Sequence, residues 1–527
     1  MKGDGGMEEY AVTIRTERLE MSDGVRLFTR VVTPADGGEK YPTVFRRTPY
    51  EEETEPTEET YRTYARNPFI RRGFALVVQH CRGRGGSEGD CVPYSAEERS
   101  DGLETLDAIR AMPHYNGEIY LNGTSYSASV LMLFLKECRE DVRGVCLAAQ
   151  TESLYHRNFV NGLCRSYSGF TWWLSMIARH RPKIAEDADI FVRPYRDLMR
   201  RATGEDLPAF TQTLLHDRYD DFWKDDPRIG CIETLRVPTL FVGGWYDYYC
   251  CGMCRMWEKL APAVREKSCF LMGPWGHALR LPQETDYPLQ GGDIPQDRIA
   301  VWFDCLRKNE PYPYGEVGKL RYYSIGEGKW HETESAYAVK PAEAFYLAQG
   351  GALTKEPPPK GERSYRYDPE TTTHHDRHDY IYKAYPPNAY PDVLSFVSEP
   401  FAEEASFVGP VRVALDLSSD CDDTAFFMRL YLVEDGESYN LTDAASTLLH
   451  ANAAYQKGET CRVDIETTPT AFTLKRGCRI RFDVSSYSDC FNRHANTAEH
   501  FALAERTKVA QNTVYFGESA IYLPRRT

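Results

Sequence analysis

The feature that most constrains the fold is a change in the apolar pattern along the chain. Buried-strand patterns at residues 41–45, 74–78 and 119–121 alternate with helical spacing at 96–112 and 126–138. Strands that alternate with helices predict a mainly parallel sheet covered on both faces. The alternation returns further along the chain, at residues 237–242, 269–272 and 296–308. We therefore expect an α/β core built from residues 1–153 and 235–314.

Two other regions depart from this alternation. Residues 154–234 contain helical stretches rich in Arg, Asp and aromatic side chains, such as 172–180 and 192–202, and they predict a helical cap inserted into the core. After residue 314, short strand patterns separated by Gly, Pro and Asp turns predict a β-sandwich over 315–527. The strands expected there are 320–325, 344–347, 411–417, 426–432, 461–465 and 478–484.

Charge and hydropathy exclude several kinds of partner. The chain has 63 basic and 78 acidic side chains and a formal net charge of -15, which argues against nucleic acid or an anionic membrane. The longest apolar run, residues 130–135, is far shorter than the about 20 residues that span a bilayer. No apolar segment follows Lys2, so no secretory signal is visible. We expect a soluble, cytoplasmic protein, and whether it forms a homo-oligomer stays open.

The cysteines and histidines give no metal signature. The 15 cysteines lack paired spacing and are interpreted as reduced thiols. Two local clusters contain zinc-type ligands: Cys250, Cys251 and Cys254, and His374, His375 and His378. The cysteine cluster has no evident fourth ligand or second pair, and the histidines lie in a polar stretch typical of a solvated loop. We expect neither a metal nor a cofactor.

The strongest local motif is Gly123-Thr-Ser125-Tyr-Ser127, between a short strand and an apolar helix. A nucleophile elbow needs this context, because a tight strand-to-helix turn exposes the serine oxygen. Ser127 stands where the usual G-x-S-x-G motif has its second glycine, so the match is relaxed. The alternative is that Ser125 simply caps the following helix.

Two later loops supply the partners that a serine nucleophile requires. Asp247 and His277 each lie a few residues beyond a predicted strand, in the order Ser, acid, His expected for an α/β arrangement. Alone, Asp247 is explained as a turn residue and His277 as a loop or capping histidine. Together with Ser125 they predict acyl transfer by a serine activated through histidine. The backbone N–H of Tyr126 and the hydroxyl of Tyr50 are the expected donors to the oxyanion.

Several motifs in a fixed order connect the chain to a known family. They are RTPY at 47–50, RGRGGSEG at 82–89, SY at 125–126, GWYD at 244–247 and GPWGH at 273–277, and matching segments continue to residue 524. With them the chain resembles the cocaine esterase-like (CocE/NonD) hydrolases, which group with X-Pro dipeptidyl-peptidases and α-amino-acid ester hydrolases. His80 departs from the acidic residue usual in the family, and Ala128 from a frequent glycine.

The resemblance implies an α/β-hydrolase core, an inserted helical cap and a C-terminal jelly-roll β-sandwich. It implies Ser125 as the nucleophile, Asp247 and His277 as its partners, and Tyr50 and Tyr126 as the oxyanion hole. The charged loop 82–89 lacks the spacing of a phosphate-binding loop, and the resemblance gives it a structural role.

The substrate pocket is expected between cap and core, where aromatic walls suit an apolar or aromatic acyl group. Its candidate residues are Phe170, Trp172, Trp173, Trp245 and Tyr248. The alternative is that the aromatic side chains of the cap hold its helices together.

We predict a serine hydrolase that cleaves a small-molecule ester or activated amide. One alternative is an X-Pro dipeptidyl-peptidase or an α-amino-acid ester or β-lactam acylase, which needs a carboxylate for the substrate amine, such as Glu186, Asp187 or Asp189. A less favoured alternative is a non-catalytic protein whose sandwich binds a polysaccharide or a protein.

Overall fold

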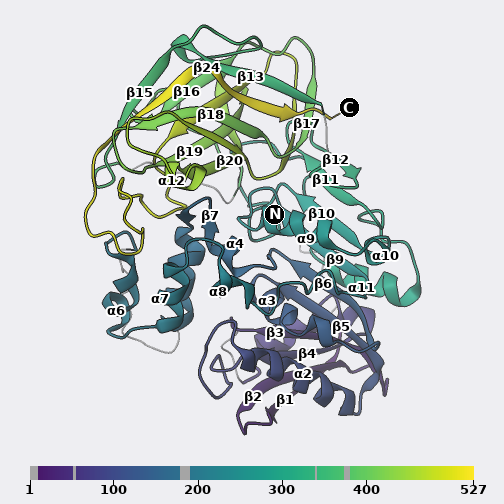
Figure 1. Ribbon diagram of the computed structural model, residues 1–527. Helices are drawn as coiled ribbons and strands as arrows, with labels where there is room; N and C mark the ends of the chain where they lie inside the picture. The colour runs from purple at the N-terminus through teal and green to yellow at the C-terminus, as the bar shows by residue number, and fades with distance from the viewer. Residues whose placement is uncertain (1–9, 51–54, 179–189, 339–340, 373–379, 527) are drawn as a thin grey trace.

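The computed structural model describes residues 10–50, 55–178, 190–338, 341–372 and 380–526. A ten-stranded sheet forms the lower body of the molecule in Figure 1 and runs in the order β1-β2-β4-β3-β5-β6-β9-β10-β11-β12. The inner strands from β4 to β11 are parallel, as expected, and the outer pairs are antiparallel. The strands are β1 Val12–Glu20, β2 Arg26–Pro34, β3 Tyr41–Thr48, β4 Ala75–His80, β5 Tyr115–Thr124, β6 Val142–Ala148, β9 Thr239–Gly244, β10 Cys269–Gly273, β11 Leu320–Ser324 and β12 Lys329–Thr333.

Helices cover this sheet and connect its parallel strands. Helix α3 packs on β5 and β3, α9 packs on β9, and α11 packs on β6. The helices are α1 Glu58–Ala65, α2 Ala96–Ala111, α3 Tyr126–Met132, α9 Cys250–Lys259, α10 Pro262–Arg265 and α11 Arg298–Lys308, with 3-10 turns at Ile70–Arg72 and Leu135–Glu137. The alternation of strand and helix in the sequence therefore gives the expected α/β core.

Strand β6 was not predicted, although it lies at the centre of the sheet between β5 and β9. Its sequence contains Arg143 and Gly144, which interrupt the apolar run. The glycine is needed there, because a Cβ on Gly144 would lie 2.7 Å from Leu306 Cδ1 of α11.

The first sheet also continues past the predicted boundary at 314/315. The strand expected at 320–325 is β11, which pairs in parallel with β10 instead of joining the second sheet. The antiparallel strand β12 completes this edge. The strand pattern alone carried no information on which sheet β11 would join.

Two helix predictions were too long. Helix α3 ends at Met132, and a separate 3-10 turn follows, because Phe134 turns onto Gly102 of α2, where a Cβ would leave no room for its ring. The stretch predicted as helical at 192–202 contains Pro194 and becomes helical only from Tyr195. Proline has a fixed φ and lacks an N–H, so a helix tolerates it only in the first turn.

The inserted region is mainly helical, as expected, but its elements are short and include a strand pair, β7 and β8, that was not predicted. They are α4 Leu154–Asn158, β7 Phe159–Val160, β8 Leu163–Cys164, a π-helical turn Tyr167–Thr171, α5 Trp172–Ala178, a 3-10 turn Tyr195–Asp197, α6 Leu198–Thr203, α7 Pro208–Leu215 and α8 Asp221–Lys224. Their interior includes Phe501 and Ala502 from the C-terminal region. The backbone of that region also hydrogen-bonds the cap, with Arg196 N–H donating to the Ala502 carbonyl at 3.0 Å.

The C-terminal region is β-rich, in agreement with the predicted sandwich, and forms the upper body in Figure 1. Its ten-stranded sheet runs β20-β19-β23-β16-β14-β13-β24-β18-β21, with β15 also paired to β24, and β17 and β22 form a separate pair. The elements are β13 Ala342–Ala348, a 3-10 turn Gln349–Gly351, β14 Ala352–Thr354, β15 Glu362–Tyr367, β16 Leu394–Ser398, β17 Ala405–Gly409, β18 Arg412–Ser419, β19 Ala425–Glu434, β20 Glu437–Thr447, α12 Leu448–Ala451, β21 Cys461–Glu466, β22 Thr470–Leu474, β23 Arg479–Ser485 and β24 Ala510–Pro524.

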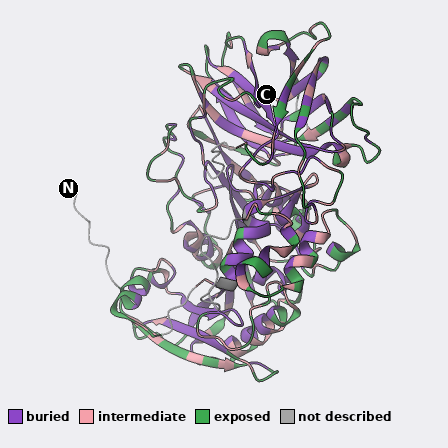
Figure 2. Cartoon of the chain, turned by 90° about the vertical axis from the view of Figure 1, so that its left-hand side faces the viewer, coloured by how far each residue is buried: buried purple, intermediate pink, exposed green. Residues whose placement is uncertain are grey.

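One apolar cluster runs from the first sheet into the second, and buried residues line the strands of both bodies in Figure 2. None of the helices in the described part of the chain is long and apolar enough to cross a membrane. The histidines His374, His375 and His378 lie outside the described residues, as do Glu186, Asp187 and Asp189.

Candidate active site

Three loops at one edge of the first sheet bring the predicted site residues together. Ser125 follows β5, Asp247 follows β9 and His277 follows β10, and these parallel strands end on the same edge. Ser125 Oγ lies 2.9 Å from His277 Nε2, and His277 Nδ1 lies 3.2 Å from Asp247 Oδ1. The geometry is that of a serine whose proton is within reach of an imidazole oriented by a carboxylate.

The turn that carries Ser125 is strained. Its φ of 56° and ψ of -131° are unusual for a residue with a side chain, and such a conformation costs about 1–3 kcal/mol. Gly123 makes the turn possible, because a Cβ there would lie 2.5 Å from Ala128 Cα. The Ser125 carbonyl accepts from Gln150 Nε2 at 2.7 Å, and its N–H donates to the Ala148 carbonyl at 2.9 Å. The fold thus holds the serine at the start of α3 in the elbow conformation.

The loops that carry Asp247 and His277 are fixed to each other through their backbones. Trp245 N–H donates to the Gly273 carbonyl and Tyr246 N–H to the Trp275 carbonyl, both at 3.0 Å. Gly244 allows this approach, since a Cβ there would overlap the Trp275 carbonyl. The relative position of the carboxylate and the imidazole is therefore set by the backbone.

Asp247 is buried, with 2% of its surface exposed. Its Oδ1 accepts from the Tyr249 N–H at 3.1 Å, while Oδ2 has no hydrogen-bond partner among the described residues. The ring of Tyr248 stacks on His277 with centroids 4.9 Å apart. One carboxylate oxygen is thus directed to the imidazole, and an aromatic face limits the movement of the ring.

The two residues predicted for the oxyanion side lie near the elbow. Tyr126 occupies the first position of α3, where a backbone N–H has no acceptor within the helix. Its hydroxyl donates to Glu98 Oε2 at 2.5 Å and accepts from the Tyr94 N–H at 3.1 Å. Burial raises the pKa of both Tyr126 and Glu98. Tyr50 follows β3 and packs, partly buried, against the cluster that contains Tyr126.

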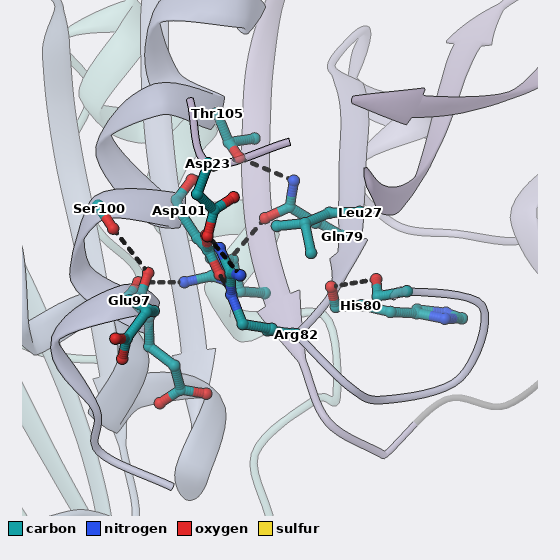
Figure 3. A network of polar contacts seen from close by, with 12 residues as sticks. Asp23, Leu27, Gln79, His80, Arg82, Glu97, Ser100, Asp101 and Thr105 are labelled. Carbon is teal, nitrogen blue, oxygen red and sulfur yellow. Dashed lines mark hydrogen bonds and ion pairs between the residues drawn. The ribbon is translucent and has the colours of Figure 1, made fainter. Parts of the chain in front are cut away.

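A buried charge network joins α2 to the sheet, and Figure 3 shows the part of it around Asp101 and Arg82. Asp101 of α2 pairs with Arg82 at 2.6 Å and with Arg47 of β3 at 3.2 Å, and Arg82 also reaches Asp23 at 2.7 Å. The loop 82–89 therefore ties α2 to the sheet, in line with the structural role expected for it.

His80 is the last residue of β4 and precedes this loop. Burial, with Arg30 nearby, lowers the pKa of His80 to about 4, and its Nδ1 accepts from the Gly86 N–H at 3.1 Å. A neutral histidine thus holds the loop at the position where the family usually has an acidic residue.

Asp101→Asn is expected to destabilise the fold by about 3–5 kcal/mol, because it leaves two buried guanidinium groups without their shared carboxylate. Urea unfolding followed by circular dichroism measures this loss. Asp107→Asn is the matched control in the same helix: this carboxylate, with its side chain 57% exposed, pairs with Arg110, and its loss is expected to cost less than about 1 kcal/mol. Equal losses for the two variants would contradict the supporting role of the buried network.

A cavity of about 630 Å³ opens beside His277 and Asp247. Its wall comes from the core, the cap and the C-terminal region together. Trp245 and Tyr248, two of the candidate pocket residues, line it. Phe170, Trp172 and Trp173 are not part of its lining. All three are buried, and Trp172 lies where the cap meets the core, with its ring centroid 5.1 Å from that of Tyr126.

Sequence analysis missed the charged and apolar residues that the cap and the second sheet contribute to this cavity. They include Arg165, Phe191, Arg429, Asn440, Asp443, Asp489 and Phe491. Arg429 carried a usable signal, because it interrupts the apolar run of β19, AFFMRLYLVE. Its cross-strand partner in β20 is Asp443. Within the described residues, no group of three or more His, Cys, Asp or Glu side chains is arranged to hold a metal ion.

The sequence matches two family models. Residues 23–279 match the X-Pro dipeptidyl-peptidase (S15 family) model, and residues 316–520 match the model of the X-Pro dipeptidyl-peptidase C-terminal non-catalytic domain. Cocaine esterase from Rhodococcus sp. (strain MB1 Bresler) is 24% identical over 538 residues, which cover 91% of this chain and 92% of that protein.

Two solved structures have the same fold over their whole length. A selenomethionine-labelled α-amino acid ester hydrolase superposes with a TM-score of 0.83 at 20% identity, over 100% of this chain and 98% of that one. An aminopeptidase from the marine sediment archaeon Thaumarchaeota archaeon superposes with a TM-score of 0.85 at 20% identity, with the same coverage.

Proposed function

We infer that this chain, which belongs to the X-Pro dipeptidyl-peptidase and cocaine esterase-like family of α/β-hydrolases, is a serine hydrolase that cleaves esters through an acyl-enzyme on Ser125. The observation that carries this proposal is the 2.9 Å contact between Ser125 Oγ and His277 Nε2, with Asp247 at 3.2 Å on the other ring nitrogen. The strained turn at Ser125 supports it, because a serine that only capped a helix would not need a left-handed φ.

Each residue of this catalytic triad has a defined role. His277 Nε2 accepts the Ser125 proton as Oγ attacks the ester carbonyl, and Asp247 accepts the Nδ1–H bond that fixes the tautomer. The Tyr126 N–H and the Tyr50 hydroxyl donate to the developing oxyanion. His277 then gives its proton to the leaving alcohol, and water, deprotonated by His277, releases the acid and restores Ser125. No step requires a metal or cofactor.

The cavity indicates which substrates to test first. Trp245 and Tyr248 give it an apolar wall beside His277, which suits the hydrocarbon part of a small ester. Asp443 and Asp489 also line it, and this favours one second candidate, an amino-acid ester hydrolase or aminopeptidase in which a carboxylate holds the substrate amine.

Burst kinetics test the proposal directly. A p-nitrophenyl ester is expected to release about one equivalent of p-nitrophenol per chain before steady state, because acylation precedes hydrolysis of the acyl-enzyme. Parallel assays with an amino-acid ester and an X-Pro-anilide compare the candidates, and we expect simple esters to have the highest kcat/KM. A preference for the X-Pro-anilide would favour the dipeptidyl-peptidase, and no turnover of any substrate would favour a binding protein.

We also propose a cytoplasmic location and a small-molecule substrate. All 15 cysteines are free thiols, which supports a reducing compartment. The net charge of -15 makes nucleic acid an unsuitable partner.

A further inference from the structure

Arg157 is a buried cation whose hydrogen-bond partners are all neutral. It lies in α4 of the cap, with 2% of its surface exposed. Nε donates to the Tyr249 hydroxyl at 3.1 Å, and Nη1 donates to Asn158 Oδ1 and to the Ser168 carbonyl, both at 2.9 Å. The guanidinium also lies over the Trp172 ring, 4.3 Å from its centroid. Among the described residues it forms no ion pair with a carboxylate.

A neighbouring arginine shows the usual arrangement. Arg228 is fully buried over the ring of Tyr94, 4.7 Å from the centroid, and Arg157 lies 5.8 Å from the same centroid. Arg228, however, is paired with Asp226 at 2.6 Å. Buried charges are normally paired because desolvation is costly. Arg157, unlike Arg228, has no carboxylate in direct contact within the described residues. A more distant anion must therefore balance its charge.

Asp247, which shares Tyr249 as a hydrogen-bond partner with Arg157, is, among the described residues, a buried anion without such a pair. Its carboxylate is buried, its Oδ2 has no hydrogen-bond partner in the described part of the chain, and its one ion-pair contact there is His277, which carries charge only when protonated. In the resting enzyme His277 must be neutral to accept the Ser125 proton. Asp247 then has no cation in direct contact.

Tyr249 connects the two charges. Its hydroxyl accepts from Arg157, and its backbone N–H donates to Asp247 Oδ1 at 3.1 Å. Burial raises the pKa of Tyr249, Arg157 opposes this shift and Asp247 adds to it, so both charges act on the same phenol. Among the described residues, the hydrogen-bond and ring partners of His277 are Ser125, Asp247, Tyr248 and Tyr249, and none of them is a cation.

We propose that Arg157 is a positioning residue that acts through Tyr249 as the counter-charge of Asp247. The inference rests on the proposed function, since it assigns Asp247 to the triad. Arg157 keeps its proton throughout, and the only proton that moves in acylation passes from Ser125 to the leaving group by way of His277. The charge of Arg157 holds the Asp247 carboxylate in place while the His277 imidazole is still neutral. The carboxylate can then accept the hydrogen bond from His277 Nδ1–H.

A double-mutant cycle separates this role from a structural one. Arg157→Met is expected to lower kcat about 10- to 100-fold with little change in KM, because the substrate does not touch Arg157. In an Asp247→Asn background, the same substitution is expected to change the rate by less than about threefold, because the charge that it balances is gone. In both the wild-type and the Asp247→Asn background, the effect of Arg157→Met is measured as the change in the rate at which fluorophosphonate labels Ser125, followed by intact mass.

Arg157→Lys is expected to retain most of the wild-type kcat, because it keeps the charge. Arg157→Gln retains hydrogen-bond donors without the charge, and is expected to behave as Arg157→Met; it also replaces that variant if the latter does not fold. The control is the double variant Asp226→Asn/Arg228→Met, which removes a buried pair beside the same Tyr94 ring without changing the net charge. When the rate is expressed per folded molecule, this control variant is expected to have the wild-type kcat.

Additive losses for Arg157→Met and Asp247→Asn, or wild-type kcat in Arg157→Gln, would overturn the inference and leave the proposed function intact. The proposed function has its own readout in this experiment. If wild-type protein is not labelled at Ser125, the triad itself fails, whatever the Arg157 variants do.

Discussion

Ser125→Ala is expected to lower kcat for ester hydrolysis by about a million-fold, because no other group can form the acyl-enzyme. The hydroxyl that it removes is the one 2.9 Å from His277 Nε2. The fold should be unaffected, since the Ser125 backbone hydrogen bonds to Ala148 and Gln150 involve no side-chain atom of the serine. Steady-state assays with a p-nitrophenyl ester measure the first effect, and thermal unfolding measures the second.

Ser125→Gly is the companion variant. Glycine adopts a φ of 56° without the steric cost that serine bears there, so the inactive protein is expected to gain about 1 kcal/mol of stability. This gain would show that serine at this position lowers the stability of the fold, a cost that is retained because the hydroxyl is needed for activity. Residual turnover in Ser125→Ala within about tenfold of wild type would place the nucleophile elsewhere.

Asp247→Asn is expected to lower kcat by about ten thousand-fold, because an amide in this position favours the wrong histidine tautomer. The contact concerned is the 3.2 Å approach of Asp247 Oδ1 to His277 Nδ1. KM should change little, because the substitution alters the hydrogen bond to His277 Nδ1 and leaves the apolar wall of Trp245 and Tyr248 in place. Initial rates over a range of ester concentrations separate the two constants.

Asp297→Asn is the control for this substitution. Asp297 pairs with Arg72 at 2.7 Å, is partly exposed and is absent from the lining of the cavity, so its loss should leave kcat unchanged. If the Asp247 and Asp297 variants lost activity to the same extent, the effect would be one of folding, not of catalysis.

The residues of the proposed triad could be singled out in the sequence because each follows a strand with a strong local pattern. The parallel pairing of β5, β6, β9 and β10 places the ends of these strands on one edge. Ser125, Asp247 and His277 therefore come together once the strand order is known. Gly123 and Gly244 added a local signal, since each permits a close backbone approach that a side chain would block.

The sheet itself was less predictable than the site. Strand β6 escaped detection because Gly144, required by the packing of Leu306, breaks its apolar run. Strand β11 was expected in the second sheet, because a strand pattern does not encode its neighbour. Its pairing with β10 depends on contacts between segments that lie far apart in the sequence.

The cavity wall was the least predictable part. Aromatic residues such as Trp172 and Trp173 are typical of a binding pocket, but here they belong to the apolar cluster that joins the cap to the core and do not line the cavity. Arg429 and Asp443 lie on β19 and β20, about 300 residues from Ser125, and reach the cavity only because the second sheet packs over the cap. The sequence marks Arg429 as an interruption of the apolar run of β19, but it does not indicate that this strand lies over the cap.

The most direct test of the acyl-enzyme mechanism is fluorophosphonate labelling of the purified protein, with peptide mapping of the adduct. We predict one adduct per chain, located on Ser125, and none in Ser125→Ala. Well-folded wild-type protein that takes up no label, or takes it up at another residue, would contradict the assignment of Ser125 as the nucleophile.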